Sequence, residues 1–348
     1  LTLMIPRTWT VSKSGWRNSA SLDVMNILIV GTGSIGRRHF RNLHALGFRK
    51  LAVVRSKHRM DGPQREFFAK YRPRVFYDLA TALAERSDAM VVSNPTSLHV
   101  RTARIAIRAG AHVFIEKPIS HSRSGVAELL REARRRKLIV YMGYHFRHHP
   151  LLKAAKRLLD AGKLGKLHSA RFITGEYLPG WHPWEDYRKG YAARRDLGGG
   201  VVLTQSHDLD LISWFFGKPR LVAADVRSSG ALGIPVDDIA VITFATPRCP
   251  VVVSHLDYLS RPPVKEFTIS GSRGRLEWDY QGNFLRLVLA NGKARTMKLP
   301  TGFKRNDMYV AEIKDFIRCI RQGRKPETDG QAGAAVLEIA LGAMDARR

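Results

Sequence analysis

The stretch Met25-Asn-Ile-Leu-Ile-Val-Gly-Thr-Gly-Ser-Ile-Gly36 decides the fold of the first half of the chain. Its first six residues have the length and composition of a buried strand, and a helical pattern follows directly after the last glycine. Three glycines spaced GxGxxG between a strand and a helix are typical of a dinucleotide-binding loop. Gly31 permits the tight turn, Gly33 lets the backbone approach a pyrophosphate, and Gly36 lets the helix pack closely on the strand. The pyrophosphate would meet N–H groups at the helix start, at Ser34 and Ile35.

The end of the second expected strand, at residues 51–54, indicates which dinucleotide is bound. A carboxylate at this position commonly binds the ribose hydroxyls of NAD, whereas this chain has Arg55 and Ser56. A guanidinium and a hydroxyl can bind a 2′-phosphate, which a carboxylate would repel. The sequence therefore favours NADP over NAD, and NAD stays open because solvated surface charges would give the same pattern.

Strands and helices continue to alternate up to about residue 142, which predicts a parallel, doubly wound sheet. Two loops follow buried strands in this region, one at residues 94–99 and one at residues 116–118. Ligands of such sheets bind at the carboxyl ends of the strands, so both loops are candidates for a ligand site. We expect residues 25–147 to form an NAD(P)-binding Rossmann domain.

The pattern changes after this point: a helix is expected over residues 151–161, followed by β-rich runs with glycine-rich turns and few helices. That arrangement predicts a largely antiparallel open sheet. Residues 148–348 are expected to form an α+β domain for substrate binding and oligomerisation, with C-terminal helices that could pack back on the first domain. The fold class is thus α/β, with a Rossmann domain and a second, α+β domain. The expected strands are 167–173, 236–245, 251–256, 266–270 and 285–289.

The glycine fingerprint, an Asn-Pro-x-x-x-His loop and a Glu-Lys-Pro loop occur in this order and spacing. With them the chain, from about Met25 to the end, resembles the glucose–fructose oxidoreductase/inositol dehydrogenase/rhizopine catabolism (Gfo/Idh/MocA) family. The resemblance implies that Lys117 contacts both the substrate and the nicotinamide, and that its bond to Pro118 is cis. It also implies a homodimer or homotetramer assembled through the second sheet. The cofactor-binding residues it implies in the two loops are Asn94, Pro95, His99, Glu116 and Lys117.

A segment at residues 175–195 is dense in aromatic, Arg and His side chains and has no regular period. Aromatic rings stack on sugar faces and Arg pairs with carboxylate or phosphate, so this segment is a candidate substrate loop. A loop that only covers the core stays open as the alternative. The substrate-binding candidates are Trp181, Trp184, Tyr187 and Arg188, together with Arg147, which lies in an Arg-x-x-Pro crossover similar to that of the family.

The run Gly198-Gly-Gly-Val-Val-Leu-Thr-Gln-Ser-His-Asp-Leu-Asp210 is similar to the family's glycine–Asp–His motif. His207 and Asp210 match its second half, and because they are three residues apart on an expected helix, Asp210 could orient the imidazole. The family's first Asp is missing, since its place is Thr204 counted from the glycines and Leu203 counted back from the histidine. Thr204 is kept as a substrate-binding candidate.

The resemblance implies an NAD(P)-dependent dehydrogenase or reductase that acts on a carbinol or carbonyl of a sugar, sugar acid or nucleotide-linked sugar. His207 is the candidate base for the hydroxyl proton, and Lys117 would stabilise the developing alkoxide. No metal is expected, because the histidines at 145, 148 and 149 have no carboxylate or cysteine at ligand spacing. A non-catalytic, regulatory member of the family would have lost the lysine or the histidine, so their presence favours an enzyme.

The net charge of +28 comes from 58 Lys and Arg against 30 Asp and Glu. A nucleic-acid-binding protein concentrates its basic residues on one stripe, whereas here they are spread along the chain without a recognisable binding motif. We therefore expect no specific nucleic-acid partner. An Arg-rich surface, or else an anionic substrate, accounts for the charge.

Two distant cysteines, Cys249 and Cys319, suit a reducing cytoplasm better than a disulfide framework. No apolar run is long enough to predict a membrane-spanning helix. Residues 1–24 are rich in Ser, Arg, Lys and Trp without a clear period, which is typical of a disordered tail or of a start assigned too early. Met25 is a natural start, and a chain beginning there is expected to fold and bind its cofactor.

Overall fold

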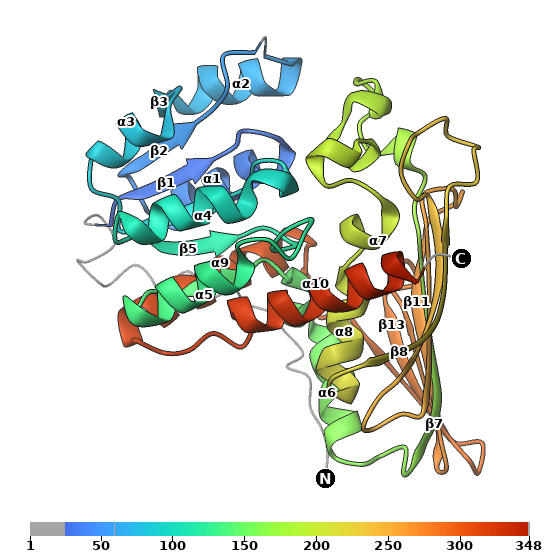
Figure 1. Cartoon of the computed structure of the whole chain (residues 1–348). Coiled ribbons are helices and arrows are strands. Elements are labelled where there is room, and N and C mark those ends of the chain that lie inside the picture. Colours follow the sequence, from blue (N-terminus) through green and yellow to red (C-terminus); the bar gives the residue numbers. More distant parts are fainter. Residues whose placement is uncertain (1–24, 59, 347–348) are drawn as a thin grey trace. The chain divides into compact units, whose positions relative to one another are not determined.

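The computed structural model describes residues 25–58 and 60–346, so the expectation about residues 1–24 lies outside the described part of the chain. The described residues divide into two compact units. One unit contains residues 25–144 and 305–334, and the other contains residues 145–304 and 335–346. Figure 1 shows the elements of both units.

The first unit is built on a six-stranded, fully parallel sheet in the order β3-β2-β1-β4-β5-β6. The order reverses between β1 and β4, whose registers align Ile27 with Ala89 and Val30 with Val92. Ligands of doubly wound sheets bind beyond the carboxyl ends of the strands at such a switch point. The expected Rossmann sheet is confirmed. Its strands are β1 (Ile27–Val30), β2 (Leu51–Val54), β3 (Arg74–Phe76), β4 (Ala89–Val92), β5 (His112–Ile115) and β6 (Val140–Met142).

Helices cover this sheet because its strands are apolar on both faces. The α9 helix, from the end of the chain, belongs to this unit and packs Ile313, Phe316 and Ile317 into the same core as Phe40 and Phe114. The helices are α1 (Ser34–Ala45), α2 (Gly62–Tyr71), α3 (Leu79–Ala84), α4 (His99–Arg108), α5 (Val126–Arg135) and α9 (Asn306–Gln322), with a short 3₁₀ helix η1 (Thr96–Leu98).

The second unit contains an eight-stranded sheet in the order β14-β13-β12-β11-β7-β10-β9-β8. Only the β7–β10 pair is parallel among the pairings of this sheet, so the predicted, largely antiparallel sheet is confirmed. The strands are β7 (Leu167–Gly175), β8 (Arg220–Arg227), β9 (Ile239–Ala245), β10 (Val251–Asp257), β11 (Val264–Gly271), β12 (Gly274–Asp279), β13 (Phe284–Leu289) and β14 (Ala294–Lys298).

The helices of this unit include α6 and α8, which lie beside one face of the sheet in Figure 1. An aromatic cluster joins α8 to the strands, with the rings of Phe172 and Phe267 5.3 Å apart and those of Phe215 and Phe267 5.7 Å apart. None of the described helices is long and apolar enough to cross a membrane. The remaining elements are η2 (His145–His148), α6 (Pro150–Asp160), η3 (Leu178–Gly180), η4 (Tyr187–Lys189), η5 (Tyr191–Ala193), η6 (Arg195–Leu197), α7 (Val201–Thr204), α8 (His207–Phe216) and α10 (Gly330–Asp345), whose start lies in the first unit.

Candidate active site

The three glycines between β1 and α1 differ in what surrounds them. Gly31 has a φ of +98°, and a Cβ there would lie 2.6 Å from the Ser93 carbonyl oxygen. A Cβ on Gly36 would lie 2.0 Å from the Gly31 carbonyl oxygen, so the helix can approach the strand only without a side chain. Gly33 is exposed, and a Cβ on it would meet nothing within 4 Å. The space above Gly33 and the first N–H groups of α1 therefore fit a pyrophosphate.

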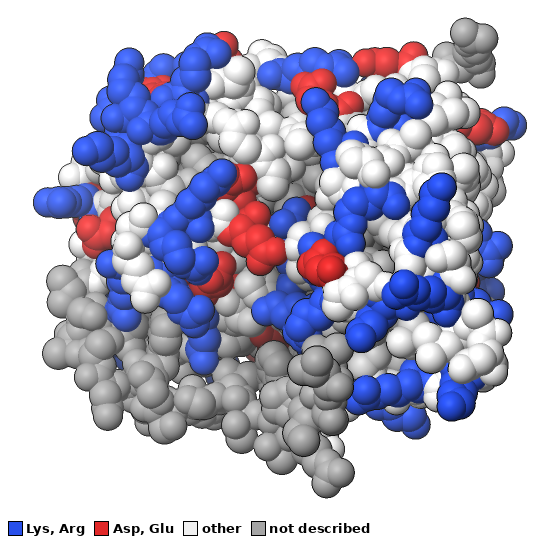
Figure 2. Space-filling model, turned by 90° about the horizontal axis from the view of Figure 1, so that it is seen from below, with Lys and Arg blue, Asp and Glu red and all other residues white. Residues whose placement is uncertain are grey.

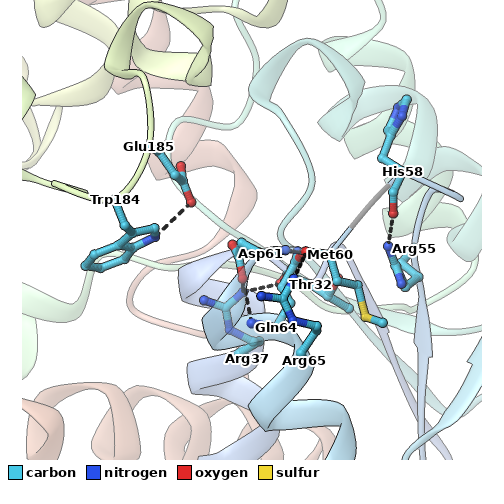
Figure 3. Close-up of polar contacts among 10 residues, drawn as sticks. All are labelled: Thr32, Arg37, Arg55, His58, Met60, Asp61, Gln64, Arg65, Trp184 and Glu185. Atoms are coloured by element: carbon cyan, nitrogen blue, oxygen red, sulfur yellow. Dashed lines mark hydrogen bonds and ion pairs between the residues drawn. The ribbon is translucent and has the colours of Figure 1, made fainter.

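A small polar network holds this loop against the start of α2 (Figure 3). The Thr32 carbonyl accepts hydrogen bonds from Arg37 Nη1 at 2.9 Å and from Gln64 Nε2 at 3.2 Å. Asp61 caps α2 by accepting from the Gln64 backbone N–H, and its carboxylate lies 3.8 Å from the Arg37 guanidinium. This network was not predicted, although Asp61-Gly-Pro-Gln64 carries a capping-box signature that could have located the helix start.

Arg55 follows β2 directly, at the position from which the sequence analysis inferred NADP. Its half-buried guanidinium donates to the His58 carbonyl and lies 5.5 Å from the centre of the Phe68 ring. The neighbouring Ser56 is exposed. Both side chains thus lie at the strand end where a 2′-phosphate would be bound, and the choice between NADP and NAD stays a prediction.

His99 ties the two loops that the sequence analysis singled out. Its Nδ1 lies 2.8 Å from the Pro118 carbonyl oxygen and its Nε2 lies 2.8 Å from that of Asn94. Burial is the largest effect on its pKa and lowers it, and a neutral imidazole can donate to only one of these carbonyls. The ring therefore has a structural role beside the expected cofactor contact, which stays a prediction. Asn94 donates in turn to Thr102 Oγ1 at 2.9 Å.

Lys117 lies at the carboxyl end of β5, and its bond to Pro118 is cis, as expected. Its backbone N–H donates to the Glu116 carboxylate at 3.3 Å. Glu116 is buried and is hydrogen-bonded to His39, whose Nε2 lies 2.6 Å from Oε1. The side chain of Glu116, expected to bind the cofactor, therefore points into the protein interior. Pro95, which is also expected to bind the cofactor, is half-buried directly before η1, and its cofactor contact stays a prediction.

His207 is the first residue of α8, and its ring is held between two side chains of η2. The ring centres of His207 and His145 are 4.4 Å apart, and those of His207 and Phe146 are 4.9 Å apart, both in edge-to-face geometry. The two histidines are each 5% exposed. His145 was expected only as a crossover or cleft-wall residue, and its contact with His207 was not predicted, because no local signal connects two residues so far apart in the chain.

Arg147 and Asp210 form a buried ion pair between η2 and α8. Arg147 Nε donates to Oδ2 at 2.9 Å and Nη2 donates to Oδ1 at 2.6 Å, and the two side chains are 8% and 1% exposed. This fork links the segment carrying His145 to the helix turn carrying His207. Arg147, expected to bind substrate, thus has a structural contact, and the orientation of His207 by Asp210 stays a prediction.

A second buried charge pair lies next to His207. Lys265 Nζ lies 3.5 Å from Asp208 Oδ1, donates to Thr174 at 2.8 Å, and lies 5.0 Å from the centre of the Phe146 ring. Burial raises the pKa of Asp208, and the Lys265 charge acts in the opposite direction. Neither residue was predicted, although the His-Asp-Leu-Asp run places Asp208 beside the candidate base.

The place of the family's missing carboxylate is filled by uncharged, buried side chains. Thr204 donates to the Gly200 carbonyl at 2.8 Å and is hydrogen-bonded to the Tyr258 hydroxyl. Leu203 is 2% exposed. Asp237 is the carboxylate that instead caps α7, accepting from the Val202 N–H at 3.0 Å. Thr204 is therefore engaged within the fold, and its contact with substrate stays a prediction.

The aromatic segment before α7 divides into anchored and exposed side chains. Trp181 lies edge-on to the Tyr258 ring at 5.6 Å, and Tyr187 donates to the Leu232 carbonyl at 2.9 Å. Trp184 is 58% exposed, with its indole N–H donating to Glu185 at 3.2 Å (Figure 3). Arg188 is also exposed, 5.2 Å from the Tyr187 ring centre. Among the four substrate-binding candidates of this segment, Trp184 and Arg188 are thus the two with exposed surface available to a ligand.

Comparison with protein families gives two matches. Residues 25–144 match the GFO/IDH/MocA model, described as an oxidoreductase family with an NAD-binding Rossmann fold. Residues 152–277 match the GFO/IDH/MocA C-terminal domain.

Individual relatives match along most of their length. UDP-N-acetylglucosamine 3-dehydrogenase of Acidithiobacillus ferrooxidans is 27% identical over 321 residues, covering 90% of this chain and 94% of the relative. Myo-inositol 2-dehydrogenase of Thermotoga maritima is 26% identical over 337 residues, covering 92% and 95%. A solved structure of the A. ferrooxidans enzyme superposes with a TM-score of 0.76 at 25% identity, covering 93% of this chain and 97% of that one. A levoglucosan dehydrogenase structure with NADH and levoglucosan reaches 0.81 at 16% identity, covering 92% and 96%, which shows the shared fold.

Proposed function

The chain belongs to the Gfo/Idh/MocA oxidoreductase family, and on that premise we propose that it transfers a hydride between NADP and a hydroxyl-bearing carbon of a nucleotide-linked sugar. The observation that carries the proposal is the loop at the switch point between β1 and β4. There Gly31 and Gly36 are required by close backbone contacts, whereas Gly33 faces open space. A glycine at a position where the protein itself leaves room for a side chain points to a ligand that needs that room.

The residues around this loop fit the dinucleotide. The N–H groups at Ser34 and Ile35 would hold the pyrophosphate at the positive end of the α1 dipole. Arg55 and Ser56 would bind a 2′-phosphate at the end of β2, which is the basis for preferring NADP. When bound, the nicotinamide accepts or supplies the hydride.

Lys117 and His207 are the proposed catalytic residues. The Lys117 ammonium would hold the substrate oxygen and stabilise negative charge that develops on it. The His207 imidazole would take the hydroxyl proton on a ring nitrogen during oxidation and return it during reduction. The ring is suited to this task because His145 and Phe146 restrict its orientation.

A nucleotide-linked sugar is the preferred substrate class. The support is the full-length similarity to a UDP-N-acetylglucosamine 3-dehydrogenase, together with the exposed Trp184 and Arg188. An indole face can stack on a sugar or base, and a guanidinium can pair with a phosphate. Free sugars, inositols and sugar acids are the alternatives, because the family fold alone does not fix a substrate.

The strong positive charge does not alter this preference. Figure 2 shows Lys and Arg side chains scattered over one face, interleaved with uncharged surface and small acidic groups. A specific nucleic-acid site would be expected to form a continuous basic stripe instead. The scattered charge favours a general attraction for anions, which would help a diphosphate substrate to approach.

We also propose that the chain forms a homo-oligomer through the exposed side chains of strands β8, β9 and β10 in its second sheet. Three valines of these neighbouring strands, Val222, Val241 and Val251, are 55%, 40% and 46% exposed. Exposed apolar side chains on adjacent strands are typical of a surface that another subunit covers.

The experiment is a substrate screen in which the reaction is monitored through the absorbance of NADPH or NADH. The panel contains UDP-N-acetylglucosamine and other nucleotide sugars, myo-inositol, sugar acids and free sugars. We expect turnover with at least one nucleotide sugar. If NADPH binds by calorimetry but no panel member reacts, the regulatory, non-catalytic alternative gains support. If neither dinucleotide binds, the proposal is wrong at its first step.

A further inference from the structure

A cluster of three ionisable side chains lies buried in the first unit, apart from the polar atoms assigned to hydride transfer. The cluster consists of His39 on α1, Glu116 at the end of β5 and Glu312 on α9. One ligand-type atom from each lies within 4.8 Å of the others. His39 and Glu312 are 0% exposed, and Glu116 is 8% exposed.

Glu312 is the unusual member of this cluster. Within the described part of the chain, neither of its carboxyl oxygens has a hydrogen-bond partner. A buried carboxylate without a partner is costly, and it also lies close to a second carboxylate, that of Glu116. Either a proton or a cation must therefore offset the charge.

The geometry favours a proton over a metal ion. His39 Nε2 and Glu116 Oε1 are 2.6 Å apart, which is a hydrogen-bond distance. Two ligand atoms that share a zinc ion at about 2.0–2.2 Å would stand about 3 Å or more from each other. These two groups therefore bind each other directly rather than a shared ion.

We propose that His39, Glu116 and Glu312 form a buried cluster in which the Glu312 carboxyl carries a proton and is neutral, and in which Glu116, held by His39, fixes the backbone position of Lys117. The contact to the lysine is the hydrogen bond from its N–H to Glu116 Oε2 at 3.3 Å. Glu116 thus uses one oxygen for His39 and the other for Lys117. A neutral Glu312 removes the like-charge repulsion that two adjacent carboxylates would otherwise exert on each other.

The other ionisable groups around Glu312 agree with this assignment. Burial is the largest effect that raises the pKa of Glu312 well above its usual range, and the Glu116 charge adds to it. Arg38 on α1 acts in the opposite direction, but its guanidinium lies over the Tyr309 ring at 4.4 Å. Tyr309 on α9 and Tyr141 on β6 have raised pKa values because both are buried, and Asp315 on α9 lies 3.3 Å from the Tyr141 hydroxyl.

The first test is the pH dependence of unfolding, which needs no substrate. The variant is Glu312→Gln, which keeps the shape but cannot ionise, and the matched control is Glu66→Gln at an exposed position of α2. A carboxyl with a raised folded-state pKa holds a proton that the unfolded chain releases above about pH 4.5. The unfolding constant of the wild type relative to Glu312→Gln should therefore rise about tenfold per pH unit from pH 5 to 7.

Parallel stability curves for the wild type and Glu312→Gln would overturn the proposal, because Glu312 would then be ionised in the folded protein. The control Glu66→Gln should follow the wild type. Elemental analysis of the full chain separates the remaining alternative. One equivalent of bound zinc or manganese that is lost in Glu312→Gln would overturn the proposal, because a cation, not a proton, would then offset the charge of Glu312.

The second test concerns Lys117 and rests on the proposed function, since it needs a panel sugar that reacts. Glu116→Ala should lower kcat by about tenfold to 100-fold with little change in the KM for the sugar, because the lysine is misplaced. Glu116→Gln should recover part of kcat by again accepting the Lys117 N–H bond. An unchanged kcat in Glu116→Ala would refute the positioning role. If no sugar reacts, the proposed function fails, whereas the unfolding test still decides whether Glu312 is protonated in the folded protein.

Discussion

The glycine loop of the first unit and the histidine turn of the second unit are built in opposite ways. The loop from Gly31 to Gly36 offers backbone N–H groups and empty space, and six consecutive residues define it. The turn around His207 depends on side chains from η2 and β11, which are distant in the chain. Two of its contacts, to His145 and Phe146, involve rings that the sequence places more than fifty residues away.

This difference teaches where variation is tolerated. A backbone site is lost when one atom is added at the wrong glycine, yet it is insensitive to what the neighbouring side chains are. A side-chain site can keep its reacting group while its neighbours are exchanged. Here the family's first carboxylate is absent, with Thr204 or Leu203 in its place, while His207 is present and packs against His145. Substitutions in the two regions should therefore change different measured quantities: turnover and stability in the histidine turn, and dinucleotide affinity and stability in the glycine loop.

The largest expected effect is the loss of turnover when a proposed catalytic side chain, first of all His207 in the histidine turn, is removed. His207→Ala should lower kcat by about 10²–10⁴-fold, the usual contribution of a general acid or base, while NADPH binding stays near that of the wild type. Lys117→Ala should act similarly. The measurement is steady-state kinetics on a reactive panel sugar, with calorimetry of NADPH as the control. Wild-type rates in both variants would remove these residues from the catalytic machinery.

Breaking the ion pair behind that turn should act on stability. Arg147→Ala leaves Asp210 buried without its fork partner, which typically costs about 3–5 kcal/mol in the free energy of unfolding. Asp210→Asn should lose less, and it should also slow turnover if the carboxylate helps to orient His207. Denaturant unfolding measures the first effect. Arg147→Lys serves as the control, because it keeps the charge but not the two-pronged geometry. A loss below 1 kcal/mol in Arg147→Ala would mean that the pair is not buried as described.

In the glycine loop, the same type of change at two positions should separate binding from folding. Gly33→Val has room within the protein, so the unfolding temperature should hold while NADPH affinity drops by roughly 100-fold or more, about 2.7 kcal/mol. Gly36→Ala places a Cβ against the Gly31 carbonyl and should cost about 1–3 kcal/mol of stability. Calorimetry and thermal unfolding of both variants test the contrast. Normal NADPH affinity in Gly33→Val would contradict the pyrophosphate site.

Much of the fold could be predicted because short, continuous stretches of sequence determine it. The apolar runs at β1, β4 and β5 are buried on both faces, and the glycine loop needs only its own six residues. Strands β3, β8, β12 and β14 were not among the expected strands, and for β8 and β14 the reason is exposure. Most of their side chains are exposed, which leaves little alternation between buried and exposed positions for a sequence pattern to register.

The candidate site was less predictable for a physical reason. Lys117 and His207 could be found from motifs, but their partners could not. Glu312 contacts the Glu116 region from a helix near the end of the chain, and Lys265 reaches Asp208 from β11. Such pairs are fixed by tertiary packing, and one sequence alone carries no signal of it.

The smallest expected effect is on the preference between NADP and NAD. It tests whether the first unit, whose glycine loop binds through the backbone, selects its dinucleotide through a side chain. Arg55→Asp should shift the preference from NADP toward NAD by about 1–3 kcal/mol, the scale of one charge-assisted hydrogen bond. The new carboxylate would repel the 2′-phosphate and could accept hydrogen bonds from the ribose hydroxyls. Lys57→Asp is the control, because Lys57 is exposed, lies two residues after Arg55, and its replacement changes the local charge by the same amount. The ratio of the two dissociation constants, measured by calorimetry, distinguishes a specific contact from a general field effect. If Lys57→Asp shifts the ratio as much as Arg55→Asp, the effect is general. If the wild type already prefers NAD, the assignment of Arg55 is wrong.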